Sequence, residues 1–174
     1  MPNLLLLIAS SLGVAFLRWH WRRRPHAAVV ANVFLCAVVF NYLWEMGQLP
    51  LFAGFATFHL LTALYHCAWY TLGDATIVIS LYTLGAWGHR TWGWGLHLHQ
   101  MDWLWLPIAG IIVAVIMERL ALDFGRWQYG PHMPVLPGLE VGILPVVQMA
   151  LLPLWSILVA RRSVPNLALE AQND

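Results

Sequence analysis

Three polar side chains interrupt an otherwise apolar stretch, "NYLWEMGQLP" at residues 41–50. Asn41, Glu45 and Gln48 stand at offsets i, i+4 and i+7, which places them on one stripe of an α-helix. A charge at membrane depth costs about 2.5–3.5 kcal/mol on insertion scales, so Glu45 favours its neutral form there and is a candidate proton donor. Asn41 and Gln48 would orient it, and Trp44 would line the site. The alternative is a carboxylate at a helix end that reaches the membrane interface.

A second carboxyl group lies in the middle of "HCAWYTLGDATIVISLY". His66, Tyr70 and Asp74 follow one another at four-residue steps, so they share one broad helix face. We predict that Asp74 is a second acid or base, or polarises Glu45 or His66, because an ionisable residue inside a membrane is a functional candidate. A structural hydrogen bond between two helices is the alternative. Gly73 would let a neighbouring helix approach closely.

Two later apolar segments each contain one polar candidate. Glu118, in "IIVAVIMERLALDFGRW", faces either the two preceding helices or the lipid headgroups. Gln148 lies between Pro145 and Pro153, in a helix that we expect to be bent and in which glutamine typically makes an interhelical hydrogen bond. We predict Glu118 as a catalytic residue and Gln148 as a substrate-binding residue.

The connection at 123–140, "DFGRWQYGPHMPVLPGLE", is rich in proline and glycine, which predicts a structured turn-rich loop. Trp127, Tyr129 and Met133 could form an apolar lid over the polar residues and contact a substrate. Ordinary anchoring at the membrane interface is an equal alternative for these side chains.

Histidines raise the question of a metal. His89, His97 and His99 form the densest cluster, but their spacing matches no closed zinc pattern. A carboxylate-imidazole set suited to iron, manganese or zinc is the other alternative, drawn from His66, His132, Glu45 and Glu118. The sequence also lacks the motifs of serine hydrolases, zinc metalloproteases and nucleotide-binding proteins. We therefore predict neither a metal nor a cofactor.

The composition identifies the environment of these residues. The 174-residue chain is 60% hydrophobic and only 10% charged, and its mean hydropathy is +0.67. Soluble domains average about 25% charged residues, so this is a membrane composition. A net charge of +1 argues against a nucleic-acid partner. The eleven tryptophans fit interfacial aromatic belts.

Apolar segments of membrane-spanning length set the fold class. Because every backbone polar group must be satisfied within lipid, we predict an all-α integral membrane bundle. Its five transmembrane helices are expected at 3–18, 27–46, 61–84, 103–122 and 141–160. We expect one transmembrane domain over 1–162 and a cytoplasmic tail over 163–174.

The arginines predict the orientation. Arg119 and Arg126 flank Asp123 closely enough to be neutralised by it. The other seven of the nine basic residues fall on one side if the N-terminus is outside and the C-terminus inside; they are Arg18, Arg22, Arg23, Arg24, Arg90, Arg161 and Arg162. In a multi-pass protein of the inner membrane, the polar candidates would then converge in the outer half of the bundle.

The segments "NYLWEMGQLPL", "HCAWYTLGDATIVIS" and "ERLALDFGRWQYGPHMPVLPGLEVGILPVVQ" together resemble a family of small polytopic bacterial membrane proteins. That family's pattern reads N-x-x-W-E-x-x-Q-x-P-L, then H-C-x-x-x-x-x-G-D, then W-x-Y-x-x-M-P with a later P-x-x-Q. The matching residues here are Asn41, Trp44, Glu45, Gln48, Pro50, His66, Cys67, Gly73, Asp74, Glu118, Trp127, Tyr129, Met133, Pro134 and Gln148.

The N-x-x-W-E element is also similar to one in the membrane-embedded terpene cyclases of meroterpenoid and indole-terpenoid pathways. In those enzymes a glutamate of this element and a later aspartate are thought to protonate an epoxide or olefin. The similarity would make Glu45 the general acid and Asp74 its partner.

These observations predict an enzyme that acts on a lipid-soluble, isoprenoid-like substrate by acid-base chemistry. Glu45 would donate a proton, Asp74 or His66 would tune or restore it, and tryptophans would stabilise a developing cation. The alternative is a non-catalytic subunit or binding protein that holds a partner helix, a pigment or a metal centre. The expected partners are the lipid bilayer and a lipid-soluble small molecule; a homo-oligomer or a larger membrane complex stays open.

Overall fold

The computed structural model describes residues 25–54 and 59–163, and these residues form four long helices. They are α2 (Pro25–Gln48), α3 (Leu60–His89), α4 (Asp102–Asp123) and α5 (Ile143–Arg162), with short 3-10 turns η1 (Leu49–Leu51) and η3 (Trp94–Leu96). In the described ranges the only β pairing is two isolated bridges. The predicted all-α class is therefore confirmed for these ranges. The predicted helix at 3–18 and the tail from 164 lie outside them.

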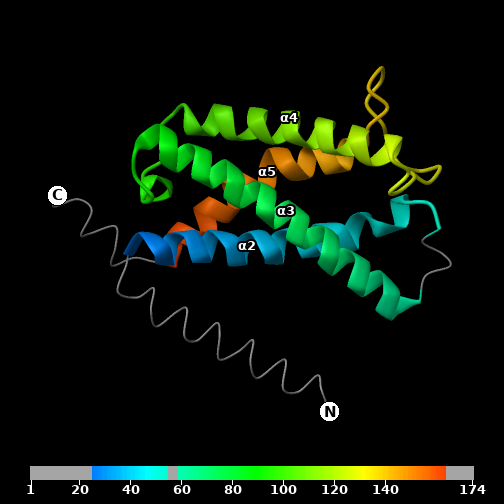
Figure 1. Ribbon diagram of the computed structural model, residues 1–174, viewed down its shortest axis with the longest axis horizontal. Helices are drawn as coiled ribbons and strands as arrows, with labels where there is room; N and C mark the ends of the chain where they lie inside the picture. Colours follow the sequence, from blue (N-terminus) through cyan, green and yellow to red (C-terminus); the bar gives the residue numbers. More distant parts are fainter. Residues whose placement is uncertain (1–24, 55–58, 164–174) are drawn as a thin grey trace, which may run out of the picture.

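The helices alternate in direction, and this brings four distant segments to one end of the bundle (Figure 1). Helix α5 packs against both α2 and α4, and α2 packs against α3, whereas α3 and α4 barely touch. The end of α2, the first half of α3, the end of α4 and the start of α5 lie near one another and near the 124–142 connection (Figure 1). This is the end where the polar candidates were expected to meet.

One stripe of α2 faces the interior along its whole length. Its buried residues recur every three or four positions, which is the period of a helix face; they are Val29, Val33, Ala37, Asn41, Glu45 and Gln48. The first half of the stripe is apolar and the second half is polar. The opposite face is apolar and exposed, as at Leu43, which is 64% exposed.

Exposed apolar faces on long helices are what lipid contact requires. Among the described residues, three helices are long and apolar enough to cross a membrane, at Ala27–Leu51, Asp102–Asp123 and Ile143–Arg162. This indicates a membrane protein built as a helical bundle. Helix α3 is not among the three, because His66, Asp74 and several hydroxyl residues lower its hydropathy. Its passage across the membrane stays a prediction.

The close helix approach expected at Gly73 is found at Gly110 instead. Among the described residues, a Cβ built on Gly73 would meet nothing within 4 Å beyond its chain neighbours and the local helix backbone, whereas one built on Gly110 would lie 1.9 Å from the carbonyl oxygen of Met149. Helices α4 and α5 therefore touch backbone to backbone at Gly110, as small residues allow in membrane bundles.

Replacing Gly110 with alanine should destabilise the bundle by about 1–3 kcal/mol or more, because the new methyl group must push two helix backbones apart. Thermal unfolding in detergent measures the effect. The matched control is Gly73→Ala, which meets open space and should change the unfolding temperature little. Equal effects of the two substitutions would contradict this packing.

Candidate buried carboxyl site

The side-chain amide of Gln148 is the centre of a buried polar cluster contributed by three helices. Its Nε2 lies 2.9 Å from Asn41 Oδ1, 3.2 Å from Glu45 Oε1 and 2.9 Å from Asp74 Oδ2. Gln148 is 2% exposed and Asn41 is completely buried. The predicted interhelical role of Gln148 is therefore confirmed, since one α5 side chain joins α2 to α3.

The two carboxyl groups of the cluster contact each other directly. The Glu45 and Asp74 side chains are hydrogen-bonded to one another, one from α2 and one from α3. Gln48 adds a further bond, because its Nε2 donates to Glu45 Oε1 at 2.7 Å and to Gln148 Oε1 at 3.2 Å. The predicted convergence of these residues in space is present.

Local helix geometry fixes the amides around this pair. Asn41 Nδ2 donates to the Ala37 carbonyl one turn earlier, at 2.8 Å, so Asn41 Oδ1 is turned toward Gln148. Trp44 Nε1 donates to Gln48 Oε1 at 3.2 Å, which turns Gln48 Nε2 toward Glu45. The four-residue and three-residue spacings of the sequence thus become hydrogen bonds along one helix face.

Glu118 forms a separate carboxyl centre with the loop. Tyr129 donates a hydrogen bond from its hydroxyl to Glu118 Oε2, and Trp127 Nε1 donates to the same oxygen at 3.4 Å. The Tyr129 hydroxyl also accepts from the Gly142 N–H at 2.8 Å. Burial, followed by the bond to Glu118, raises the pKa of Tyr129 above its usual value, so this hydroxyl remains a donor.

The loop is tied to the end of α2 by backbone bonds. Ala53 N donates to Gln128 O at 2.9 Å, and Gly130 N donates to Leu51 O at 2.7 Å. The ring of Phe52 contacts the rings of Trp127 and Tyr129, with centroids 6.4 and 5.8 Å away. Met133, in the same loop, is 7% exposed. The expected structured loop is present, whereas substrate contacts of its side chains stay a prediction.

His66 is linked to the loop through aromatic contacts. Its ring stacks on Tyr70 with centroids 6.2 Å apart and planes 21° apart, and Tyr70 in turn contacts Trp127 edge-on at 5.5 Å. Tyr70 also interacts electrostatically with Glu45 and Arg126. The i, i+4 face predicted for His66 and Tyr70 therefore connects the loop tryptophan to the carboxyl cluster.

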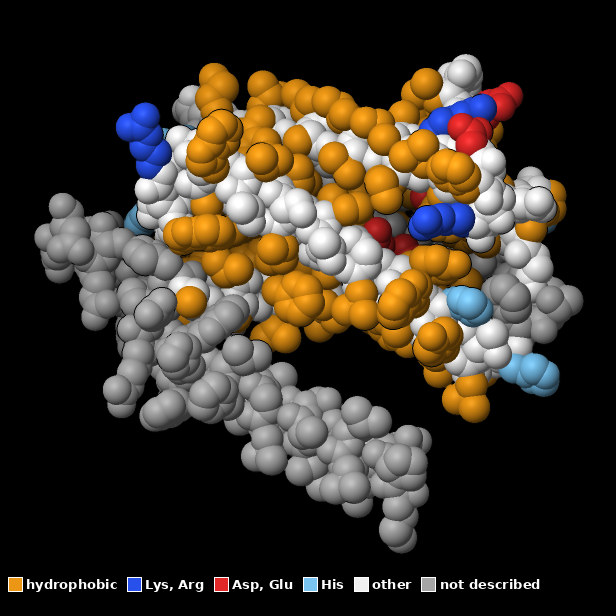
Figure 2. Space-filling view, viewed as in Figure 1, with side chains coloured by type: hydrophobic (Ala, Val, Ile, Leu, Met, Phe, Trp, Pro, Cys, Tyr) orange, Lys and Arg blue, Asp and Glu red, His pale blue; other side chains and the backbone are white. Residues whose placement is uncertain are grey.

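Acidic side chains show at the surface in the gap between α3 and α4 (Figure 2). A basic side chain borders this recess, and apolar side chains surround both (Figure 2). The recess forms where α3 and α4 separate and α5 lies behind them.

Replacing Tyr129 with phenylalanine should cost about 1–3 kcal/mol of stability, because Glu118 loses a donor and the Gly142 N–H loses its acceptor. The change in the detergent unfolding temperature measures it. The control is Tyr65→Phe, whose side chain is 67% exposed. An unfolding temperature that does not respond to Tyr129→Phe would argue against the Glu118 centre.

The histidines at the other end of the bundle belong to a different structure. His89 Nε2 pairs with Asp102 Oδ1 at 2.8 Å, and the His89 ring is stacked between Trp94 and His99, each 5.2 Å away. In the part of the chain that the structure describes, no three His, Cys, Asp or Glu side chains are placed to hold a metal ion. His97 is exposed.

Asp102 is the buried acid that sequence reasoning missed. It is 1% exposed and accepts hydrogen bonds from His89, from Trp105 Nε1 at 2.8 Å and from the His99 N–H at 2.8 Å. A lone aspartate between methionine and tryptophan at the start of an apolar helix was the signal that could have found it. Its partners assign it to holding the 90–101 connection in place.

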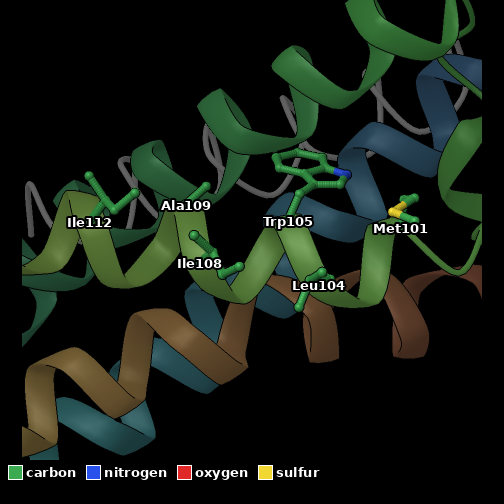
Figure 3. Close-up of a pocket in the computed structure, with 6 residues that line it drawn as sticks. All are labelled: Met101, Leu104, Trp105, Ile108, Ala109 and Ile112. Atoms are coloured by element: carbon green, nitrogen blue, oxygen red, sulfur yellow. The ribbon is translucent and has the colours of Figure 1, made fainter.

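The outer face of α4 has a shallow apolar groove (Figure 3). It is lined by Met101, Leu104, Trp105, Ile108, Ala109 and Ile112. Because these side chains offer almost no polar atoms, the groove suits lipid contact rather than chemistry.

Comparisons of this chain with protein-family models, with curated proteins and with solved structures find no match. What the site does must therefore be argued from its own geometry.

Proposed function

We propose that this protein is a membrane-embedded enzyme that acts on a hydrophobic substrate, with an isoprenoid as the favoured class, by carboxylic-acid general acid-base catalysis. The observation that carries the proposal is the pair of hydrogen-bonded carboxyl groups, Glu45 and Asp74, held by the side-chain amides of Gln48 and Gln148 inside an apolar bundle. A polar contact that only holds two helices together requires one polar side chain and its partner, not two adjacent carboxyl groups. Two adjacent acids in a lipid-facing bundle suit proton transfer to a substrate that brings no charge of its own.

Each predicted residue has a role in this mechanism. Glu45 donates the proton. Asp74 returns the proton to Glu45 or polarises the Glu45 carboxyl group. His66 and Glu118 are the further acid-base candidates around the recess. Residues that bind or shape the substrate are Asn41, Trp44, Gln48, Tyr70, Trp127, Tyr129, Met133 and Gln148. The faces of Tyr70 and Trp127 would stabilise positive charge that develops on the substrate.

The resemblance of "NYLWE" to an element of membrane-embedded terpene cyclases supports the same assignment, with Glu45 as the acid and Asp74 as its partner. The position of these two residues in one cluster is consistent with it. Isomerisation or cyclisation, in which a proton is added and later removed, is the reaction type that this chemistry favours.

We place the protein in the cell inner membrane as a multi-pass protein with five spans, the N-terminus outside and the C-terminus inside. The distribution of the arginines supports this orientation. It puts the carboxyl cluster in the outer half of the bundle and the His89–Asp102 pair on the cytoplasmic side. A homo-oligomer is compatible with the exposed apolar faces of the helices.

The test is mass spectrometry of the small molecules and metals that copurify with the detergent-solubilised protein. The wild type and Glu45→Gln are prepared identically. A bound isoprenoid or other neutral lipid, enriched or altered in the variant, is the expected result. A stoichiometric metal or pigment that the variant loses would instead identify a binding protein or a subunit of a larger complex.

A further inference from the structure

The Gln148 amide has fewer hydrogens than there are oxygen acceptors around it. This shortage limits the protonation states that Glu45 and Asp74 can adopt. An amide nitrogen has two hydrogens, yet Gln148 Nε2 lies within hydrogen-bonding distance of three oxygens. The two shorter contacts, at 2.9 Å, go to Asn41 Oδ1 and Asp74 Oδ2. Glu45 Oε1 has its own donor in Gln48, at 2.7 Å.

One oxygen of each carboxyl group is therefore committed to an amide N–H. The two carboxyl groups also share a hydrogen bond with each other. Such a bond requires a proton on one of the two, because a carboxylate can only accept. Without that proton, two carboxylates would be in contact inside the bundle.

A second proton is disfavoured in this arrangement. On Glu45 Oε1 or Asp74 Oδ2 it would weaken the hydrogen bond that this oxygen accepts from Gln48 or Gln148, because a protonated carboxyl oxygen is the poorer acceptor. Within residues 25–54 and 59–163, the ion pairs join His89 to Asp102, and Arg119 to Asp123 and Glu140. The titratable groups that interact with Glu45 are Asp74, Glu118, Cys67 and Tyr70.

We infer that Glu45 and Asp74 hold one proton between them, and that Gln148 is the positioning residue that fixes this state. The inference rests on the proposed function only in treating the pair as the acid of the site. When the shared proton passes to a substrate, it leaves two carboxylates beside the cation that forms, and it returns when that cation loses a proton. The substrate class that this charge change favours is a neutral molecule that becomes cationic on protonation.

Infrared spectroscopy of the purified full-length protein at neutral pH tests this without a substrate. The carbonyl stretch of a protonated carboxyl group is separate from carboxylate bands and shifts in D₂O. We expect intensity for one protonated carboxyl group per wild-type chain. Intensity for none or for two would overturn the inference, and this count does not depend on any variant folding.

Variants then locate the proton. Glu45→Gln and Asp74→Asn should each abolish the band, because the remaining carboxylate gains an amide donor in place of its partner. Glu118→Gln, outside the pair, should leave it unchanged. Gln148→Met should double the band, because Asp74 loses its donor and takes up a proton of its own. If the band survives in both single carboxyl variants, or does not change in Gln148→Met, the inference that Glu45 and Asp74 share one proton is wrong.

The outcome is independent of the proposed function. A band for one protonated carboxyl group in a protein that binds no lipid would support the shared proton and contradict the proposed enzyme. A band for two protonated groups in a protein that binds and converts a lipid would support the enzyme and contradict the shared proton.

Discussion

Replacing Glu45 with glutamine should lower turnover of the lipid substrate by about 10²–10⁴-fold, the usual contribution of a general acid. Thermal stability should change little. Glutamine has nearly the same shape, and it can still accept from Gln48 and donate to Asp74, so the cluster stays satisfied. What it lacks is a proton to give. The measurement is single-turnover kinetics in proteoliposomes, beside thermal unfolding of the same preparations.

The control for this substitution is Glu140→Gln, because the Glu140 side chain is 81% exposed and pairs only loosely with Arg119, at 3.8 Å. It removes the same charge without touching the cluster and should leave turnover unchanged. If Glu45→Gln unfolds the protein, Glu45 is a structural residue. If turnover is unaffected, Glu45 is not the acid.

Removal of the Asp102 carboxyl group should produce the largest loss of stability in the bundle. Asp102→Ala leaves His89, the Trp105 indole N–H and the His99 N–H without their acceptor. Each buried donor that loses its acceptor typically costs about 1–3 kcal/mol, and the three losses occur together. The 90–101 connection should loosen as a consequence, since Trp94 stacks on His89 and its Nε1 donates to Tyr82 O at 3.0 Å.

Thermal unfolding in detergent measures the stability. Asp123→Ala is the matched control, because Asp123 is the last residue of the same helix, is about half exposed and makes one surface pair with Arg119 at 3.2 Å. Its cost should be about 1 kcal/mol or less. An Asp102→Ala protein as stable as this control would show that the buried acid is not a structural centre.

Helix positions and the polar stripe of α2 could be predicted from the sequence because both are local. Apolar length sets where a membrane helix can lie, and offsets of three and four residues set which side chains share a face. Asn41, Glu45 and Gln48 accordingly share one buried stripe, and Arg119 pairs with Asp123 as expected.

Contacts between distant segments could not be predicted in the same way. The choice of Gly110 rather than Gly73 as the close-packing position depends on which helix lies beside each glycine. The pairing of Glu118 with Tyr129 depends on how the loop folds back over α4, and the pairing of His89 with Asp102 depends on how α3 and α4 meet at the 90–101 connection. No spacing along the chain encodes these choices.

The most direct test of acid catalysis at the carboxyl pair is chromatography with mass detection of the copurified lipid, before and after incubation with fresh protein. Isomerisation or cyclisation preserves the molecular formula, so we expect a new compound of identical mass with the wild type and none with Glu45→Gln. A lipid that returns unchanged from the wild type, or a product formed equally by the variant, would contradict the assignment of Glu45 and Asp74 as a catalytic pair.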